Sequence, residues 1–350
     1  MIHYVATRYW LSVMDWFLVE WAPELEATIQ RLAYPELCRK RELPRGAWIF
    51  ADVERLSPAE QARAAQIWNA LAEAGKGVRL LNHPVRSMRR YELLRMLHET
   101  GVNAFDVMRL DEMRRPKRYP VFVRRERDHG GDESALLAGP EELEAEIDRR
   151  VRAGQSLDGR IAVEFCGEAD ARGLYRKYSA FRIGDAIVPR HVLFSREWLI
   201  KGHDVLDPEV AAEEFAYIRD NPHEGELREV FERARIDYGR VDYSVVGGRI
   251  QVYEINTAPV IGDFGPEACD ALRQPVLGLV AARLAEAFAA LDPGGEGAPI
   301  SAPRARPSLD HTRLRYGLER LLRAVGLRRF EPRIVLWVLD RRDAWRARRG

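Results

Sequence analysis

Three oxygen-bearing side chains fall within one short segment, Asp242 to Asn256. Gly247 and Gly248 predict a tight hairpin turn inside it, so Asp242, near the start of the first strand, comes opposite the end of the second. Glu254 and Asn256 are two residues apart and therefore share one face of that strand. Two carboxylates and an amide suit Mg²⁺, which proteins hold with a few carboxylates and substrate phosphates. The segment predicts a metal site, and an edge hairpin with solvated polar side chains is the alternative.

The elements that must position this hairpin are strands and helices in the second half of the chain. Alternating residues predict another hairpin, 175–183 and 186–194, turning at Gly184-Asp185. A strand over 160–165 breaks at Cys166-Gly167, and a strand over 119–124 runs into a polar, glycine-bearing segment. Apolar residues at helical spacing predict helices over 140–153, 208–219, 225–234 and 268–291.

The first part of the chain predicts a small α/β unit. An apolar strand over 47–52 is followed by a helix over 58–74, which starts with Ser57 and Pro58. A second strand, 78–82, follows after Gly75 and Gly77, and the short connections indicate a parallel βαβ unit. A further helix over 85–100 ends at Gly101. Together with the later hairpins, this order of elements predicts an α/β (α+β) fold.

Composition excludes several classes of protein. The chain has 350 residues, of which 46% are hydrophobic and 31% charged, as in folded globular proteins rather than disordered ones. A net charge of +1 excludes attraction of the whole chain to nucleic acid. No segment approaches the ~20 apolar residues of a membrane helix, and Asp15 interrupts the apolar run 10–19, which we do not interpret as a signal peptide. Three cysteines without a CxxC pair favour a reducing cytoplasm.

The C-terminal segment differs from the rest of the chain. Residues 301–350 hold 14 arginines against 5 acidic residues. Apolar residues at helical spacing and the run Ile334–Leu339 predict that this extension docks on the body of the protein or on a second copy. Recruitment of nucleic acid or an anionic membrane is the alternative, and we expect neither.

Several motifs appear in an order that resembles the ATP-grasp superfamily. These are the Asp…Glu-x-Asn pattern with Glu254 twelve residues after Asp242, a basic residue (Arg90) eleven positions before Gly101, and the strand 120–124 ahead of a glycine loop. The strand 163–166 looks like the family's hinge strand. The superfamily includes glutathione synthetase, D-alanine–D-alanine ligase, biotin carboxylase and the ligases that add glutamate to a ribosomal protein.

The resemblance implies an ATP-grasp fold with an N-terminal βαβ pre-ATP-grasp domain and an ATP and Mg²⁺ site, with Mn²⁺ as a possible substitute. The implied metal ligands are Asp242, Glu254 and Asn256. The residues implied to bind the phosphates of ATP are Arg90, Arg124, His129, Gly130 and Gly131. Those implied to bind adenine are Glu164, Phe165 and Cys166. Glu168 or Asp170 is implied to bind the ribose.

The chain departs from the family pattern at three places. Arg90 and Arg124 stand where the family has lysines, and arginine offers planar, bidentate contacts to phosphate oxygens. The glycine loop is short and acidic. Lys177-Tyr-Ser179 occupies the register where the family commonly has Asp-x-Arg. We expect Lys177, Arg182 or Arg190 to supply the missing cation, and the resemblance implies that Arg182 or Arg190 faces an acylphosphate.

The expected activity is that of an ADP-forming carboxylate–amine ligase acting on small-molecule or peptide carboxylates and amines. A non-catalytic ATP-binding module and a nucleic-acid-associated protein acting through the basic tail are the alternatives; the latter implies steep salt dependence of binding. The expected organisation is an N-terminal domain 1–84, an ATP-grasp domain 85–291 with its hinge near 164–167, a linker 292–308 and a basic extension 309–350.

Overall fold

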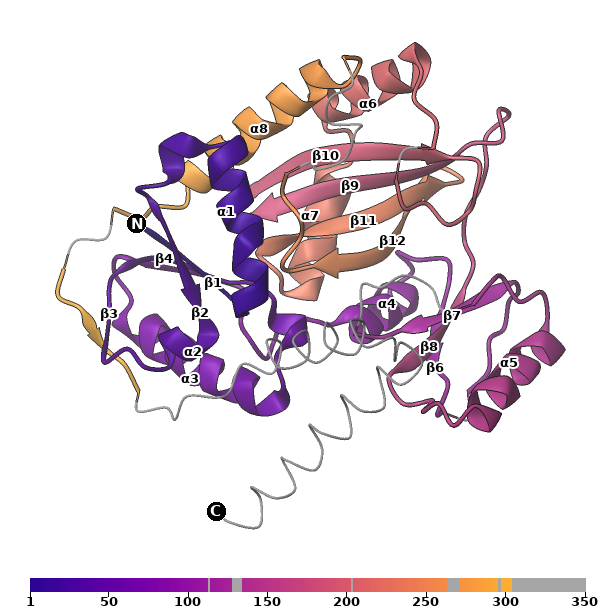
Figure 1. The fold of residues 1–350 in the computed structure, drawn as a ribbon, viewed down its shortest axis with the longest axis horizontal. Helices are drawn as coiled ribbons and strands as arrows, with labels where there is room; N and C mark the ends of the chain where they lie inside the picture. The colour runs from indigo at the N-terminus through magenta and orange to yellow at the C-terminus, as the bar shows by residue number, and fades with distance from the viewer. Residues whose placement is uncertain (113, 128–133, 203, 263–270, 295–296, 304–350) are drawn as a thin grey trace, which may run out of the picture.

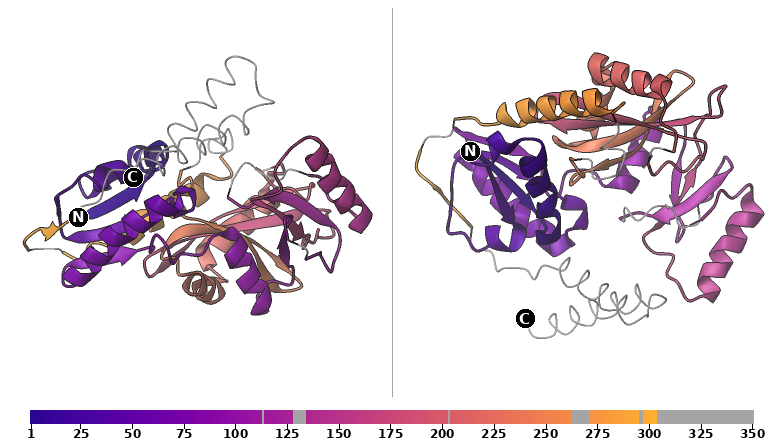
Figure 2. Two further views of the ribbon diagram at one scale, coloured as in Figure 1. Left: turned by 90° about the horizontal axis from the view of Figure 1, so that it is seen from below. Right: turned by 45° about the horizontal axis from the view of Figure 1, so that its top comes forward.

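The computed structural model describes residues 1–350 apart from 113, 128–133, 203, 263–270, 295–296 and 304–350. His129, Gly130 and Gly131 of the expected glycine loop, and the basic extension 309–350, lie outside the described residues. Three lobes, each built on its own sheet, are visible in Figures 1 and 2. Within the described ranges, no helix is long and apolar enough to cross a bilayer.

The first lobe is a parallel sheet with the strand order β2-β1-β4-β5. Helix α3 (Pro58–Ala74) joins β4 (Gly46–Phe50) to β5 (Val78–Leu81), which confirms the predicted βαβ unit. A capping box starts α3: the Ser57 hydroxyl accepts from the Glu60 amide, and the Glu60 carboxylate accepts from the Ser57 amide. The remaining elements are β1 (Ile2–Ala6), α1 (Leu11–Glu20), β2 (Ile29–Ala33), α2 (Tyr34–Leu37), and the short pair β3 (Glu42–Leu43) and β13 (Ile300–Ser301).

The second lobe is a small antiparallel sheet with the order β6-β8-β7. Its two faces pack on different helices. Val121, Val123 and Ala162 pack with α5, whereas Val107 and Ile161 pack with α4. The elements are α4 (Arg90–Glu99), β6 (Val107–Arg109), β7 (Val121–Arg125), α5 (Pro140–Arg152) and β8 (Arg160–Glu164).

The third lobe is an antiparallel sheet with the order β10-β9-β11-β12, built from the two predicted hairpins. Gly247 and Gly248 turn the second hairpin with positive φ angles of 56° and 75°, which glycine adopts without steric cost. The elements are β9 (Tyr175–Ile183), β10 (Ala186–Ser195), α6 (Pro208–Asp220), α7 (Glu224–Ala234), β11 (Tyr238–Val246), β12 (Arg249–Asn256) and α8 (Gln274–Ala289).

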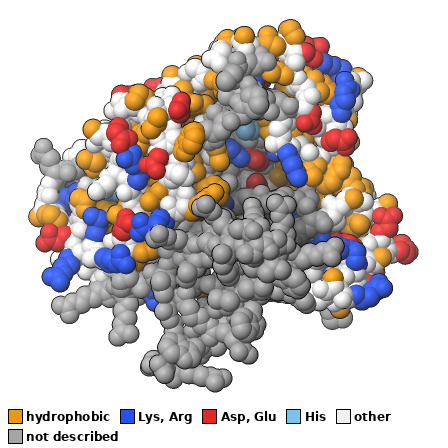
Figure 3. Space-filling model, in the orientation of Figure 1, with side chains coloured by type: hydrophobic (Ala, Val, Ile, Leu, Met, Phe, Trp, Pro, Cys, Tyr) orange, Lys and Arg blue, Asp and Glu red, His pale blue; other side chains and the backbone are white. Residues whose placement is uncertain are grey.

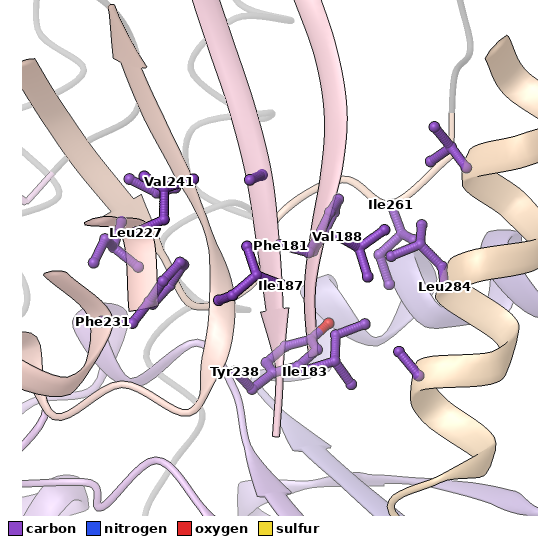
Figure 4. Packing of buried hydrophobic residues seen from close by; sticks show 14 of the residues in the cluster. Phe181, Ile183, Ile187, Val188, Leu227, Phe231, Tyr238, Val241, Ile261 and Leu284 are labelled. Atoms are coloured by element: carbon purple, nitrogen blue, oxygen red, sulfur yellow. The ribbon is translucent and has the colours of Figure 1, made fainter. Parts of the chain in front are cut away.

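Different helices cover the two faces of this sheet. Figure 4 shows Ile187 and Val241 packed with Phe231 of α7 on one side, whereas Phe181 and Val188 point toward α8 on the other. Side chains alternate along a strand, so Lys177 and Ser179 share the face of Phe181. One end of that face packs against α8. At its other end, Lys177 lines a cavity, which is described below.

The observed architecture confirms the predicted α/β class, with a four-stranded parallel sheet and antiparallel sheets of four, three and two strands in the described part of the chain. The main departures lie near the N-terminus. Strand β1 is the fully buried second strand of the parallel sheet, and it was not predicted from the sequence. Helix α4 begins at Arg90 rather than at residue 85.

Candidate active site

A cavity of about 610 Å³ lies between the small antiparallel sheet and the large one. One part of its wall is apolar and aromatic, with Leu94, Phe105, Phe122, Val163, Trp198 and Tyr253. The other part is charged. Near the middle of the face in Figure 3, basic, acidic and histidine side chains lie together. The cavity brings together ten of the residues singled out from the sequence: Arg124, Glu164, Phe165, Cys166, Glu168, Asp170, Lys177, Asp242, Glu254 and Asn256.

The carboxylate pair comes from the hairpin β11–β12. The strand register places Asp242 directly opposite Glu254 and Arg240 directly opposite Asn256. A register shift follows immediately, between Asp242 and Tyr243, so that Tyr253 is the extra residue on β12. Bulges of this kind are frequent beside active sites, where they redirect side chains.

Two arginines from distant elements contact the Glu254 carboxylate. Arg90 of α4 forms an ion pair with its Oε2, and the Arg124 guanidinium of β7 lies 3.4 Å from the same oxygen. The side chain of Arg90 is 5% exposed, that of Arg124 is 14% exposed and that of Glu254 is 17% exposed. Arg90 does not line the cavity itself, but Glu254 connects it to the cavity wall. Two partly buried cations thus stand beside the carboxylate pair.

The donor set at this end fits a hard divalent cation. In the described part of the chain, no cluster of three or more His, Cys, Asp or Glu side chains is placed to hold a metal alone. Asp242 and Glu254 supply carboxylate oxygens, and the amide oxygen of Asn256 accepts a hydrogen bond from the Ala258 amide at 2.9 Å. Mg²⁺ typically uses one or two carboxylates together with water and substrate phosphates. The residues present therefore suit Mg²⁺ bound together with a nucleotide.

The Glu164 carboxylate was expected to contact adenine, but in the structure it accepts hydrogen bonds from other parts of the protein. Its Oε1 accepts from the amides of Lys117 and Arg118, at 3.0 and 3.1 Å. Its Oε2 accepts from the Asp106 amide at 3.1 Å and the Arg118 Nε at 3.2 Å. Four donors satisfy this buried carboxylate, so it anchors the segment before β7, and Glu164 also lines the cavity. Its expected role beside adenine stays a prediction.

The two residues after Glu164 form part of the aromatic wall. The Phe165 ring lies 5.7 Å from that of Trp198, edge to face, and its amide donates to the Pro120 carbonyl. The Cys166 carbonyl accepts from the Tyr253 hydroxyl at 3.0 Å. Burial raises the pKa of the Cys166 thiol, so this sulfur is an apolar wall atom rather than a thiolate nucleophile.

The structure separates the two candidates for the ribose. Asp170 accepts from the amides of Arg172 and Leu174 and pairs with Arg176 at 2.8 Å, and the Leu174 amide is the main cause that lowers its pKa. This carboxylate is committed to its own turn. Glu168 also lines the cavity and receives one long contact, 3.4 Å, from the Gly247 amide. Glu168 is the better placed of the two to accept from a ligand hydroxyl.

Of the three expected cations, only Lys177 lines the cavity. Its ammonium donates to the Ile200 carbonyl at 2.6 Å and so holds the segment that carries Trp198. Arg182 does not reach the cavity: it lies five residues after Lys177, hence on the opposite face of β9, where it contacts the Gly184 carbonyl and Asp237. The structure thus does not bring Arg182 together with the expected residues that line the cavity.

Arg190 is the third expected cation and is 2% exposed. It is the extra residue at a register shift of β10, between Pro189 and His191. Its guanidinium lies 3.4 Å from the Gly262 carbonyl and 4.9 Å from the centre of the Trp21 ring. Arg190 therefore holds the segment that follows Asn256 and does not line the cavity.

Sequence reasoning missed Arg240, which lines the cavity beside the carboxylate pair. Its Nε donates to the Asp242 Oδ1 at 2.9 Å. The signal was available, because Arg240 and Asp242 are two residues apart on one strand and so share a face. Trp198 was also missed, because its approach to Phe122, at 5.2 Å between ring centres, depends on tertiary packing.

No family model and no curated protein matches the sequence. Among solved structures, the chain is similar to D-alanine–D-alanine ligase from Bacillus anthracis complexed with ATP, at 12% identity over 82% of this chain and 99% of that chain, with a TM-score of 0.45. It is similar to a RimK-domain ATP-grasp protein from Sphaerobacter thermophilus, at 16% identity over 80% and 98%, with a TM-score of 0.40. It is also similar to the macrocyclase MdnC from Microcystis aeruginosa bound with precursor peptide MdnA, at 10% identity over 82% and 100%, with a TM-score of 0.43.

Proposed function

We propose that this chain is an ATP- and Mg²⁺-dependent carboxylate–amine ligase of the cytoplasm. The observation that carries the proposal is the division of one cavity into an aromatic part and a charged part. Aromatic and aliphatic walls suit a purine base, and arginines beside a carboxylate pair suit a triphosphate with its cation. The two kinds of wall that Mg·ATP would require thus lie in one cavity, which supports the proposal.

Each part of the nucleotide has a candidate partner. Phe122, Phe165 and Trp198 supply aromatic surface for the base, and Glu168 supplies an acceptor for the ribose. Arg124 supplies donors for the phosphates from the cavity wall, since guanidinium groups bind phosphate oxygens in a bidentate manner. Arg90 does not line the cavity, so it would add positive charge through its ion pair with Glu254. Asp242, Glu254 and Asn256 would hold Mg²⁺, or Mn²⁺ in its place. The bound metal would supply Lewis-acid charge neutralisation at the phosphates.

The proposed reaction has two steps. In the first, a substrate carboxylate oxygen attacks the γ-phosphorus of ATP, the bond to the β-phosphate oxygen breaks, and ADP and an acylphosphate form. In the second, an amine nitrogen attacks the acyl carbon, inorganic phosphate leaves, and the nitrogen loses a proton to give an amide. Little covalent chemistry falls to the protein, which aligns the reactants and offsets charge. Arg240 stands at the charged end, where the transferred group would lie.

Acceptor-dependent release of ADP tests this proposal. Purified full-length protein is incubated with Mg·ATP and mixtures of amino acids and short peptides, and ADP is measured with and without each mixture. We expect release that requires an added carboxylate and amine and that Asp242→Asn abolishes. A non-catalytic ATP-binding module would bind ATP but release no ADP with any mixture. Release equal in the parent and in Asp242→Asn would refute the assignment of the cavity.

A further inference from the structure

A row of polar residues crosses all four strands of the large antiparallel sheet at one level. His191 of β10 is opposite Ser179 of β9, Ser179 is opposite Asp242 of β11, and Asp242 is opposite Glu254 of β12. Both register shifts of the sheet fall beside this row, one next to His191 and one next to Asp242. Ser179 has no exposed surface. The inner members of the row are therefore built into the sheet and are not a solvated edge.

The hydrogen bonds along this row run in one direction. The Ser179 hydroxyl is 2.9 Å from the Asp242 Oδ1 and 2.8 Å from the His191 Nε2. A carboxylate can only accept, so the single hydroxyl proton of Ser179 is donated to Asp242. Ser179 must then accept from His191, which requires a proton on Nε2. The row thus delivers an ordered donor to one oxygen of Asp242.

We propose that Ser179 and His191 are positioning residues that fix the Asp242 carboxylate for binding a divalent cation, an inference that rests on the proposed function. Ser179 and Arg240 both donate to Oδ1, each at 2.9 Å. Among the described residues, the structure records for Oδ2 only a 3.3 Å contact from Arg240. Oδ2 is therefore the oxygen that remains for a cation.

A hydroxyl suits this position for an electrostatic reason. It restricts rotation of the carboxylate without placing another positive charge beside the cation. Partners of this kind orient metal ligands in proteins, and their removal typically lowers metal affinity by about 10- to 100-fold. A purely structural role for Ser179 would instead change stability and leave the affinity for metal unaltered.

Binding of Mn²⁺ to the full-length protein tests the proposal. Free Mn²⁺ is measured by electron paramagnetic resonance in the presence of a non-hydrolysable ATP analogue. We expect Ser179→Ala to raise the Kd for Mn²⁺ about 10-fold. His191→Leu should also raise it, whereas His191→Gln, which keeps a side-chain N–H donor, should restore affinity to nearer that of the parent.

Ser195→Ala is the matched control. Ser195 of β10 is also fully buried, and its hydroxyl also donates to an aspartate, Asp204. Removing it should leave the Kd for Mn²⁺ within about twofold of the parent, because Asp204 is not one of the proposed ligands. Thermal unfolding of every variant verifies that it is folded.

The outcomes separate the two proposals. If the parent binds Mn²⁺ with the nucleotide and folded Ser179→Ala has the same Kd, the positioning role is wrong and the proposed function stands. If Ser179→Ala does not fold, the comparison of His191→Leu with His191→Gln decides, and equal affinities overturn the inference. If the parent itself shows no nucleotide-dependent Mn²⁺ binding, the proposed function fails and this inference fails with it.

Discussion

Replacing Arg124 by alanine should weaken ATP binding by an amount that the structure bounds. The Arg124 guanidinium is 14% exposed and lies 3.4 Å from Glu254, which is long for a charge-assisted hydrogen bond. A hydrogen bond to a charged group contributes about 1.5–3 kcal/mol. Giving up the long contact to Glu254 offsets less than about 1 kcal/mol of this. The net loss is about 1–2 kcal/mol, or roughly a 5- to 30-fold increase in Kd.

Isothermal titration with a non-hydrolysable ATP analogue and Mg²⁺ measures this change. Arg124→Lys should bind more tightly than Arg124→Ala, because it keeps the charge but loses the planar fork of donors. Arg125→Ala is the control, since Arg125 is the next residue on β7 and therefore points to the opposite face. Affinities of Arg124→Ala and the parent that agree within twofold would refute the assignment of Arg124 as a phosphate ligand.

Three further predictions follow from the same side chains and from two buried carboxyl groups elsewhere. Asp242→Asn and Glu254→Gln should each abolish metal-dependent turnover while the melting temperature stays within a few degrees; undiminished turnover in both would contradict the metal site. Burial raises the pKa of Asp52 to about 6 from 3.8. The folded protein therefore binds this proton more tightly than the unfolded chain, and the associated stability is present below pH 4 and lost as the pH rises through 6. Relative to the parent, the free energy of unfolding of Asp52→Asn should therefore rise by up to about 3 kcal/mol between pH 4 and 7, as measured with guanidinium. A difference between the two proteins that does not change with pH would contradict the raised pKa of Asp52. Glu214 and Arg273 form a pair, each 1% exposed, with both donor–acceptor distances 3.0 Å. Glu214→Met should lower the free energy of unfolding by about 3–5 kcal/mol, measured with urea, because it removes the Glu214 carboxylate from a buried guanidinium; a loss below about 1 kcal/mol would show that the pair is not needed.

The hairpin that carries the carboxylate pair could be predicted from the sequence because its geometry is local. Two glycines define the turn, and a period of two residues defines the faces, so the position of Asp242 opposite the end of the second strand follows from about fifteen residues. The same rule separates Arg182 from the cavity. Lys177 and Arg182 are an odd number of residues apart, and this spacing alone places them on opposite faces of β9.

Strand β1 could not be assigned in the same way. It is short and buried on both faces, so it lacks the alternation that marks a half-exposed strand. Its place between β2 and β4 depends on pairing with segments that come later in the chain. Hydrophobic periodicity therefore gave a signal for the amphipathic helices and the hairpins and none for this strand.

The partners of Arg90, Glu254 and Glu164 were decided by tertiary structure alone. Arg90 meets Glu254 across 164 positions of the chain, and Glu164 is satisfied by the segment that contains Arg118. A sequence shows that a carboxylate is present, but not whether backbone amides already occupy its oxygens. The turn and strand alternation of the carboxylate hairpin are short-range properties of the chain. Which cations and amides surround each carboxylate depends on how the three sheets pack together.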